Sequence, residues 1–390
     1  MKRLKSSTKG FLLGVLSTLV ILGVAFIAWN WNYIIHGEAS PTNMGGLGKV
    51  AAISQKINSV YLGDVDQENL TDYMCLGLVT GLEDKYSTYY TQEQYEKIMQ
   101  SNAGHYLGLG VVIEQKTEGG DIVVSECEEG SPAAEAGIEA GDILRIIDDQ
   151  SVEGLTNSQI VDIIQGKSEG DIVTLTVQRG EETYTAEIKL KDLESVSASG
   201  KMLENHVGYI QITEFTKVTP EQFEESFKSL QGQGMEKLII DLRSNPGGLV
   251  VGVCDTLRQI LPEGLIVYTE DKLGRRSEER CDGATPLDIP LAVLVNGSSA
   301  SASEIFAGAV QDYELGTIVG TTTFGKGVVQ DTFPLSGGGA VKLTVSHYFT
   351  PEGNDINGKG ITPDVEVEQP EDAAQDLQLE KAIEIVDAND

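Results

Sequence analysis

The chain has few basic residues, few histidines and few cysteines for its 390 residues. Its 28 lysines and arginines stand against 60 acidic residues, and the net charge of −32 argues against a nucleic-acid partner because like charges repel. The four histidines form no pair and the four cysteines show no Cys-x-x-Cys spacing, so the sequence contains no metal-ligand pattern. We therefore predict no nucleic-acid partner, no metal and no cofactor.

Charge is also absent from one long run near the N-terminus. Residues 11–29 are 19 uncharged residues, which at about 1.5 Å per residue span roughly the 30 Å hydrocarbon core of a bilayer. Basic residues precede this run, and it ends in aromatic side chains typical of a membrane interface. We predict a cytoplasmic tail at 1–9 and an uncleaved transmembrane anchor at 10–33, with the bulk of the chain outside the cytoplasm at the cell membrane. A cleaved signal peptide, whose apolar run is shorter, stays the alternative.

The few cysteines belong to an exported chain, in which disulfides are chemically permitted. Cys75, Cys127 and Cys254 lie in apolar segments, which favours buried thiols. A bridge between Cys254 and Cys281 stays open, because the sequence does not choose among the possible pairings.

Composition divides the rest of the chain into five parts. Residues 34–48 form a linker rich in proline, glycine and asparagine, and apolar residues at helical spacing predict a helical region at 49–103. Short strands and turns predict a small, mostly β domain at 104–191. Alternating strands and helices predict an α/β core at 192–370, with a mixed sheet and flanking helices. An acidic amphipathic helix follows at 371–390, and the two helical ends favour a homodimer.

Within the α/β core, hydrophobic patterning predicts individual elements. The expected strands are residues 207–215, 237–243, 265–269, 291–295, 317–320 and 341–349. The expected helices are residues 219–230, 249–261 and 302–313.

Residues 104–191 carry two specific motifs, Ser131-Pro-Ala-Ala-Glu-Ala-Gly137 and Gly141-Asp-Ile-Leu144. With one helix among short strands, this order resembles a circularly permuted PDZ domain of bacterial proteases. The resemblance implies that a peptide adds as a strand to a sheet edge and that loop amides hold its terminal carboxylate. A glycine-rich turn that merely opens a hairpin is the alternative. The matching loop consists of Tyr106, Leu107, Gly108, Leu109 and Gly110.

A serine-rich turn at 299–304 and an isolated lysine, Lys326, carry the chemistry. The preceding strand and following helix place Ser301 at a helix N-terminus, where unpaired amides favour negative charge. A lysine in a dry pocket can act as the base that activates a serine hydroxyl. The amide of Ala302 could then donate to an oxyanion, and the turn that ends in Asn-Pro-Gly-Gly could supply a second donor from Gly247.

Other interpretations of these residues stay open. The serines could cap a helix, since serine is a preferred N-cap residue. Residues 320–326 spell most of a phosphate-binding loop, although Gly327 stands where Ser or Thr should bind magnesium. A Ser-His-Asp triad could instead use His206 or His347 together with Asp312.

Taken in order, the motifs resemble those of the carboxyl-terminal processing, or tail-specific, proteases from about residue 50 to residue 368. The resemblance implies that Ser301 is the nucleophile, that Lys326 is the general base and that Gln330 orients it. We assign supporting roles to Glu304 and Asp312. The motifs are Tyr86-Ser-Thr-Tyr89, the PDZ-like segment, Val207-Gly-Tyr-Ile-Gln-Ile212, Asp241 to Gly248, Ser299 to Glu304, Gly325-Lys-Gly327 and Tyr348-Phe-Thr-Pro-Glu-Gly353.

The chain departs from the family pattern at Lys85, where many members have proline, and at Gln165, where a basic residue is common. The catalytic positions match. We predict a membrane-anchored serine endopeptidase that captures C-terminal tails with its PDZ domain and cleaves them through an acyl-enzyme. A catalytically silent PDZ scaffold at the membrane, or an amidase or esterase with the same chemistry, are the alternatives.

Overall fold

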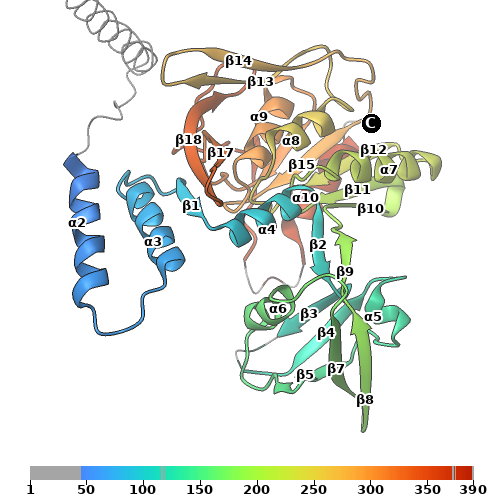
Figure 1. Ribbon diagram of the computed structural model, residues 1–390. Helices are drawn as coiled ribbons and strands as arrows, with labels where there is room; N and C mark the ends of the chain where they lie inside the picture. The colour runs from blue at the N-terminus through green and yellow to red at the C-terminus, as the bar shows by residue number, and fades with distance from the viewer. Residues whose placement is uncertain (1–44, 116, 118, 371–372, 374, 389–390) are drawn as a thin grey trace, which may run out of the picture. The chain divides into compact units, whose positions relative to one another are not determined.

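The structure is a computed structural model that describes residues 45–115, 117, 119–370, 373 and 375–388 (Figure 1). The predicted tail at 1–9, the anchor at 10–33 and most of the linker lie outside these residues. Within the described ranges, every helix is too short or too polar to cross a bilayer. The chain divides into two compact units, residues 1–74 and 75–390.

The smaller unit contains α2 (Gly45–Val60) and the first half of α3 (Gln67–Thr80). The predicted helical spacing is thus confirmed. Both helices leave large apolar side chains exposed, among them Leu47, Ile53 and Tyr73.

The larger unit contains a six-stranded sheet in the order β10-β11-β12-β15-β16-β19. β10 is antiparallel to β11, whereas the other neighbours are parallel. β12 and β15 are buried along their whole length, as expected for parallel strands covered on both faces. The strands are β10 (Ala198–Met202), β11 (Val207–Ile212), β12 (Lys237–Asp241), β15 (Leu291–Val295), β16 (Thr317–Gly320) and β19 (Val365–Glu366).

Helices cover both faces of this sheet. Ile240 packs into a core with Phe223 and Phe306, whereas its neighbour Ile239 packs into a second core with Val386, because successive side chains of a strand point to opposite faces. The first face carries α7 (Thr219–Gly232), α8 (Val250–Leu257) and α9 (Ala302–Asp312), and the second carries α10 (Leu377–Ala388). The strands β15 and β16 match their predicted bounds, and α10 begins later than predicted.

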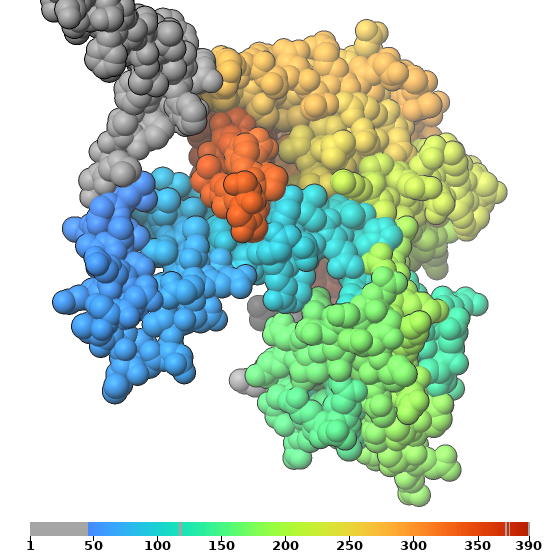
Figure 2. All heavy atoms as spheres, in the orientation of Figure 1, coloured from blue at the N-terminus to red at the C-terminus, as the bar shows by residue number. Residues whose placement is uncertain are grey.

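A second sheet is antiparallel, in the order β1-β18-β13-β14, with β17 beside β18. Its buried residues Ile266, Val267, Cys281 and Tyr348 belong to the first core. β14 and β17 were not expected from the sequence. β14 is exposed and charged along most of its length, so it has no apolar pattern typical of a strand. The β17–β18 turn touches α4 (Gln92–Asn102), since Gly339 N–H donates to Gln92 Oε1 at 2.9 Å (Figure 2, orange and cyan). The strands are β1 (Thr88–Tyr90), β13 (Gly264–Asp271), β14 (Arg276–Cys281), β17 (Val328–Pro334) and β18 (Ala340–Phe349).

A third sheet, in the order β3-β4-β5-β7-β8 with β6 beside β5, builds the small β domain around its own hydrophobic core. β3 is an edge strand, and a two-stranded ribbon of β2 and β9 lies where the chain enters and leaves the domain. The strands are β2 (His105–Gly108), β3 (Val111–Gln115), β4 (Ile122–Cys127), β5 (Ile143–Ile147), β6 (Gln150–Ser151), β7 (Ile172–Arg179), β8 (Glu182–Lys189) and β9 (Lys191–Glu194). The helices are α5 (Pro132–Glu135) and α6 (Asn157–Gln165).

All four cysteines are free thiols. Cys254 and Cys281 are buried, and the Cys281 thiol donates to the Leu261 carbonyl at 3.4 Å rather than forming a bridge. Burial raises the pKa of Cys254 to about 12. Cys75 and Cys127 are only half-buried, so the prediction of buried thiols is right for Cys254 alone among the three.

Candidate active site

Ser301 sits in a sharp turn between β15 and α9. Its backbone has φ 56° and ψ −111°, a conformation that residues with a Cβ rarely adopt. A strained strand-to-helix turn of this kind presents a serine hydroxyl as an exposed nucleophile. The amide of Ala302, the first residue of α9, has no acceptor among the described residues, whereas the Ser303 amide donates to the Ala300 carbonyl at 3.1 Å. An unpaired amide at a helix N-terminus favours negative charge.

The structure separates Ser301 from the two other serines of its motif. Ser299 Oγ donates to the Leu242 carbonyl at 2.7 Å, and Ser303 Oγ donates to the Asn245 carbonyl at 3.0 Å. Both of these serines are completely buried. Their hydroxyls therefore join the serine turn to the neighbouring Asn-Pro-Gly-Gly turn, and only Ser301 of the three lines the pocket.

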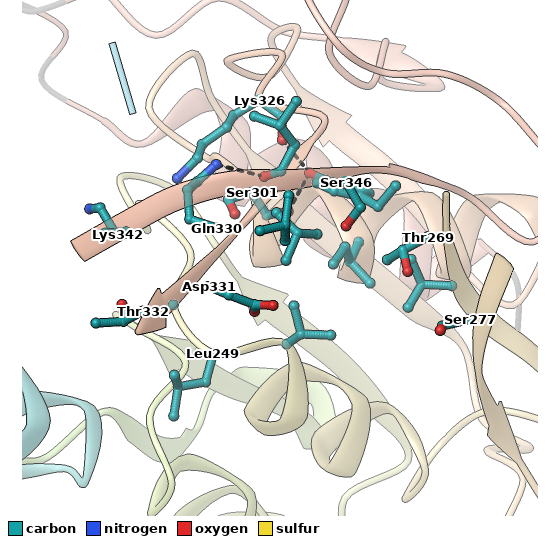
Figure 3. A pocket seen from close by; sticks show the side chains of 18 of the residues that line it. Leu249, Thr269, Ser277, Ser301, Lys326, Gln330, Asp331, Thr332, Lys342 and Ser346 are labelled. Atoms are coloured by element: carbon teal, nitrogen blue, oxygen red, sulfur yellow. Dashed lines mark hydrogen bonds between the residues drawn. The ribbon is translucent and has the colours of Figure 1, made fainter. Parts of the chain in front are cut away.

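Lys326 reaches the same pocket from the loop before β17 (Figure 3). It is half-buried, and this burial is the main cause that lowers the pKa of its ammonium group. The nearby charge of Lys342 lowers the pKa further, Glu304 opposes the shift and Lys85 adds to it. In the described part of the chain no hydrogen bond joins Lys326 Nζ to Ser301 Oγ, so the two side chains line one pocket without a bond between them.

Glu304 connects the loops that carry these two side chains. Its carboxylate is fully buried and accepts from the amides of Ser301 (2.8 Å), Gly325 (2.7 Å) and Lys326 (2.9 Å), and from the Thr323 hydroxyl. A buried charge needs such saturation with donors to be tolerated. Glu304 therefore holds the backbones of Ser301 and Lys326 together, and its supporting role in catalysis stays a prediction.

The buried hydroxyl of Tyr348 also lies between the two loops. It is within hydrogen-bonding distance of the carbonyl oxygens of Ser301 (2.9 Å) and Lys326. Burial raises the pKa of Tyr348 well above its usual value, so the hydroxyl stays protonated and remains a donor.

Gln330 lies near Lys326 but bonds elsewhere. Its amide donates to the Val328 carbonyl at 3.3 Å and, at 3.5 Å, to the Thr344 hydroxyl. In Figure 3 the side chains of Lys326, Gln330 and Lys342 end on the same side of the pocket. The orienting role of Gln330 stays a prediction.

Two amides border Ser301 without a protein acceptor. Those of Ala302 and Gly248 have no partner among the described residues, and Gly248 lines the pocket with Ser301. By contrast, Gly247 N–H already donates to Asn245 Oδ1 at 2.8 Å. The Gly247 amide, predicted as the second oxyanion donor, is thus already bonded, whereas the Gly248 amide and the predicted first donor, Ala302, are open. The oxyanion role stays a prediction.

Gly247 allows close packing of the backbone against the Ser301 turn. A Cβ at this residue would lie 2.6 Å from the Ala300 oxygen and 2.9 Å from the Ala302 nitrogen, and its φ is +107°. Only glycine tolerates both the backbone angle and this approach. The residue therefore lets the two strand-to-helix turns touch.

The pocket has a volume of about 530 Å³ and is lined by strands of the antiparallel sheet, by α4 and by the segments at the starts of α8 and α9. One wall is apolar, whereas Asp331, Lys342 and Glu278 contribute charges at its border. A cavity with a mostly apolar wall and a few convergent polar groups suits an extended peptide. The apolar wall consists of Val250, Val267, Ile305, Val328 and Val345.

The loop predicted to bind a carboxylate lies at the start of the small β domain. Leu109 is buried in the domain core, so it can offer only its backbone, and Gly108 pairs with Lys191 in the ribbon. Gly110 has φ +77°, and a Cβ there would lie 2.2 Å from Ser131 Cβ, so glycine is required. Burial and the nearby Glu128 raise the pKa of Tyr106 to about 12.

Beside this loop, the edge strand β3 and helix α6 contact each other. Asn157 Nδ2 of α6 donates to the Ile113 carbonyl of β3 at 3.3 Å. Leu107 packs half-buried against the same core. An edge strand with unpaired backbone groups is what strand addition requires.

Two family models match the chain, the Peptidase family S41 model over residues 206–367 and the PDZ domain model over residues 106–190. A "Probable CtpA-like serine protease" of Staphylococcus aureus strain COL is 34% identical over 360 residues, covering 91% of this chain and 71% of that protein. A carboxy-terminal-processing protease of Bartonella bacilliformis is 35% identical over 366 residues, covering 90% and 83%. This chain belongs to the S41 family of carboxy-terminal-processing serine proteases.

The fold of a candidate S41 protease of Bacteroides fragilis is similar, with a TM-score of 0.50 at 15% identity over 85% of this chain and 93% of that one. The predictions of a serine-type carboxy-terminal-processing protease and of a PDZ domain are thus confirmed. The small β domain described above is this PDZ domain.

Two alternatives for the S41 site are not assembled by the structure. His347 is exposed on β18, His206 Nδ1 lies 3.1 Å from the Gly234 oxygen, and neither lines the pocket. Asp312 ends α9 and accepts from the Glu352 amide at 2.8 Å, so it supports the turn after β18 rather than the pocket. Lys326 is followed by strand β17, whereas a phosphate-binding loop continues into a helix.

Sequence reasoning missed two residues of this S41 site. Tyr348 and Tyr86 stood in quoted motifs, but neither received a role. The tyrosine within the predicted strand 341–349 was a signal for Tyr348, because a buried hydroxyl must find a partner. Tyr86 is 240 residues before Lys326 in sequence, and no local pattern connects them.

Proposed function

We propose that this protease cleaves the C-terminal tails of proteins with a Ser301–Lys326 dyad through an acyl-enzyme. The observation that carries this proposal is that Ser301 alone of its motif faces the pocket, in an elbow conformation, and that Lys326 lines the same pocket with a lowered pKa. A neutral lysine amine is a competent general base for a serine hydroxyl.

In the first step, neutral Lys326 takes the proton of Ser301 while Oγ attacks the scissile carbonyl carbon. The resulting oxyanion accepts from the amides of Ala302 and Gly248. The Lys326 ammonium then gives its proton to the departing amine, and the C–N bond breaks. Water, deprotonated by Lys326, attacks the acyl-enzyme in the same way and releases the new C-terminus.

The PDZ domain is proposed to capture the substrate before cleavage. A tail adds along the edge strand β3, and amides of the 106–110 loop hold its terminal carboxylate. A test compares cleavage of one peptide with a free or an amidated C-terminus. Equal KM values for the two forms would contradict carboxylate capture.

The test of the dyad uses an unfolded, reduced and alkylated protein as substrate. Ser301→Ala and Lys326→Ala are expected to abolish cleavage, whereas Ser298→Ala and Lys359→Ala, both exposed and outside the pocket, retain it. Activity of Ser301→Ala would support the silent-scaffold alternative with a contaminating protease. Faster turnover of small esters or amides than of peptides would favour the amidase or esterase alternative.

The membrane anchor and the homodimer are proposed on different grounds. The proposed anchor at 10–33 contains the uncharged run of residues 11–29, and extraction of the full chain from membranes by alkaline carbonate would contradict an integral anchor. For the dimer, the exposed apolar side chains of α2 and α3 are the supporting feature. Ile53→Asp should then give monomers in light scattering, and the exposed control Gln55→Asp should not.

A further inference from the structure

The segment at residues 84–88, which precedes the PDZ domain, contributes an aromatic ring to the catalytic pocket region. Lys326 Nζ lies 4.9 Å from the centroid of the Tyr86 ring. Lys85 Nζ lies 4.7 Å from the same centroid and 5.6 Å from the Phe324 ring. Two ammonium groups therefore share one ring, at distances where cation–π attraction operates.

Several contacts hold this segment in place. Asp84 accepts from the Tyr86 amide at 3.1 Å and from the Ser87 hydroxyl, and Ser87 Oγ in turn accepts from the Thr344 amide at 3.0 Å. Immediately afterwards, β1 pairs with β18. The ring position is thus set by a hydrogen-bonded turn attached to the strand that also carries Lys342.

The groups that face Lys326 have opposing effects on its proton. Lys342 of β18 and Lys85 are like charges, which disfavour the ammonium form, and burial acts in the same direction. Glu304 of α9 favours the ammonium form, as does the electron-rich face of Tyr86. Tyr348 lies beside the backbone of Lys326 and stays neutral.

We propose that Tyr86 is a positioning residue that holds the Lys326 side chain in the pocket, and that Lys85 is a neighbouring charge that promotes its neutral, basic form. This inference rests on the proposed function of Lys326 as general base. The ring attracts the ammonium group formed after each proton transfer, and Lys85 competes for that ring. The N-terminal segment therefore belongs to the machinery of the base, although it lies far from it in sequence.

The test measures how fast a fluorophosphonate labels Ser301 in the full chain as pH is varied, with peptide cleavage as the second readout. Labelling displaces fluoride from phosphorus by Ser301 Oγ and needs only the activated serine. Lys85→Gln removes the like charge, so the pKa of Lys326 should rise. The acidic limb of the profile, in which the labelling rate increases with pH, should then move to higher pH, and labelling near neutral pH should fall severalfold. Lys85→Arg keeps the charge and should restore the wild-type profile.

Tyr86→Phe keeps the ring and should leave the profile close to wild type. Tyr86→Leu removes the ring and should lower the maximal labelling rate severalfold, with the limb moved to lower pH. The matched control is Lys201→Gln, because Lys201 lies 5.0 Å from the Tyr209 ring and is exposed but does not line the pocket. Its profile should not change.

Several results would overturn the inference. Unchanged profiles in Lys85→Gln and Tyr86→Leu would do so, as would a loss of rate in Tyr86→Leu with no movement of the limb, which indicates packing alone. Chemical denaturation of each variant separates folding from chemistry. Labelling that persists in Lys326→Ala would instead remove the proposed function itself, so the two failures are distinguishable.

Discussion

The proposed nucleophile, Ser301, and its proposed base, Lys326, are held in different ways. Ser301 ends the turn at residues 296–301, between a buried parallel strand and a largely buried helix. Lys326 extends from a loop before an antiparallel strand, and its surroundings come from Lys85, Tyr86 and Lys342 in other parts of the chain. The serine is thus placed by local geometry, whereas the protonation of the lysine depends on distant segments.

The largest effect is expected at Glu304, because its carboxylate binds the backbones of both Ser301 and Lys326. Glu304→Gln places an amide NH₂ against backbone donors, which should cost on the order of 3 kcal/mol of unfolding free energy. We also expect at least a hundredfold loss of serine labelling. Urea denaturation and fluorophosphonate labelling measure the two effects, with exposed Glu352→Gln as control. Wild-type labelling in Glu304→Gln would contradict the connecting role.

Removing the Tyr348 hydroxyl should loosen the contact between the Ser301 and Lys326 loops, with a smaller effect than Glu304→Gln. Tyr348→Phe loses the donor to the Ser301 and Lys326 carbonyls and keeps the buried ring. We expect a rate loss of roughly tenfold, equivalent to about 1.4 kcal/mol. Steady-state cleavage of a peptide measures it. Since Tyr106→Phe changes a hydroxyl in the PDZ domain, it should leave the maximal rate unchanged; similar kcat losses in both would argue against a specific role of Tyr348.

A change in the charges near Lys326 alone should shift the pH dependence of the rate without abolishing activity. The pKa of Lys326 is lowered by burial and by Lys342, and only the neutral amine is a base, so the rate should rise with pH through that lowered pKa. Lys342→Met raises the pKa of Lys326, and the acidic limb should move to higher pH. Lys359→Met, at an exposed site, should leave the limb in place. A limb that moves to lower pH in Lys342→Met would contradict this account.

The smallest effect on catalysis is expected at Asp312, which lies at the C-terminal end of α9, the helix that follows Ser301. Asp312→Ala loses the bonds to the Glu352 amide and to Asn354. Loss of stability should be about 1 kcal/mol, while kcat should stay within a factor of about two, a difference too small to indicate lost transition-state contacts. Thermal unfolding measures the stability and peptide cleavage measures kcat. A large fall in kcat would indicate that Asp312 has a role in the active site.

Local sequence patterns alone determined much of this protein. The buried apolar runs predicted β15 and β16 with their observed bounds, and the strand followed by a helix placed a serine at a helix N-terminus. The order of the motifs also indicated the S41 family and the PDZ domain. These features follow from residues that are neighbours in the chain, and short-range periodicity and turn chemistry report on such neighbours.

Only the tertiary structure decided which groups are available. It bonded Ser299, Ser303 and the Gly247 amide to other partners and left Ser301 and the Gly248 amide facing the pocket. It also brought Ser87 to Thr344, across 257 residues, and with it Tyr86 to the base. Availability of a polar group depends on where its hydrogen-bonding capacity is used, and that depends on contacts between segments that no local pattern connects.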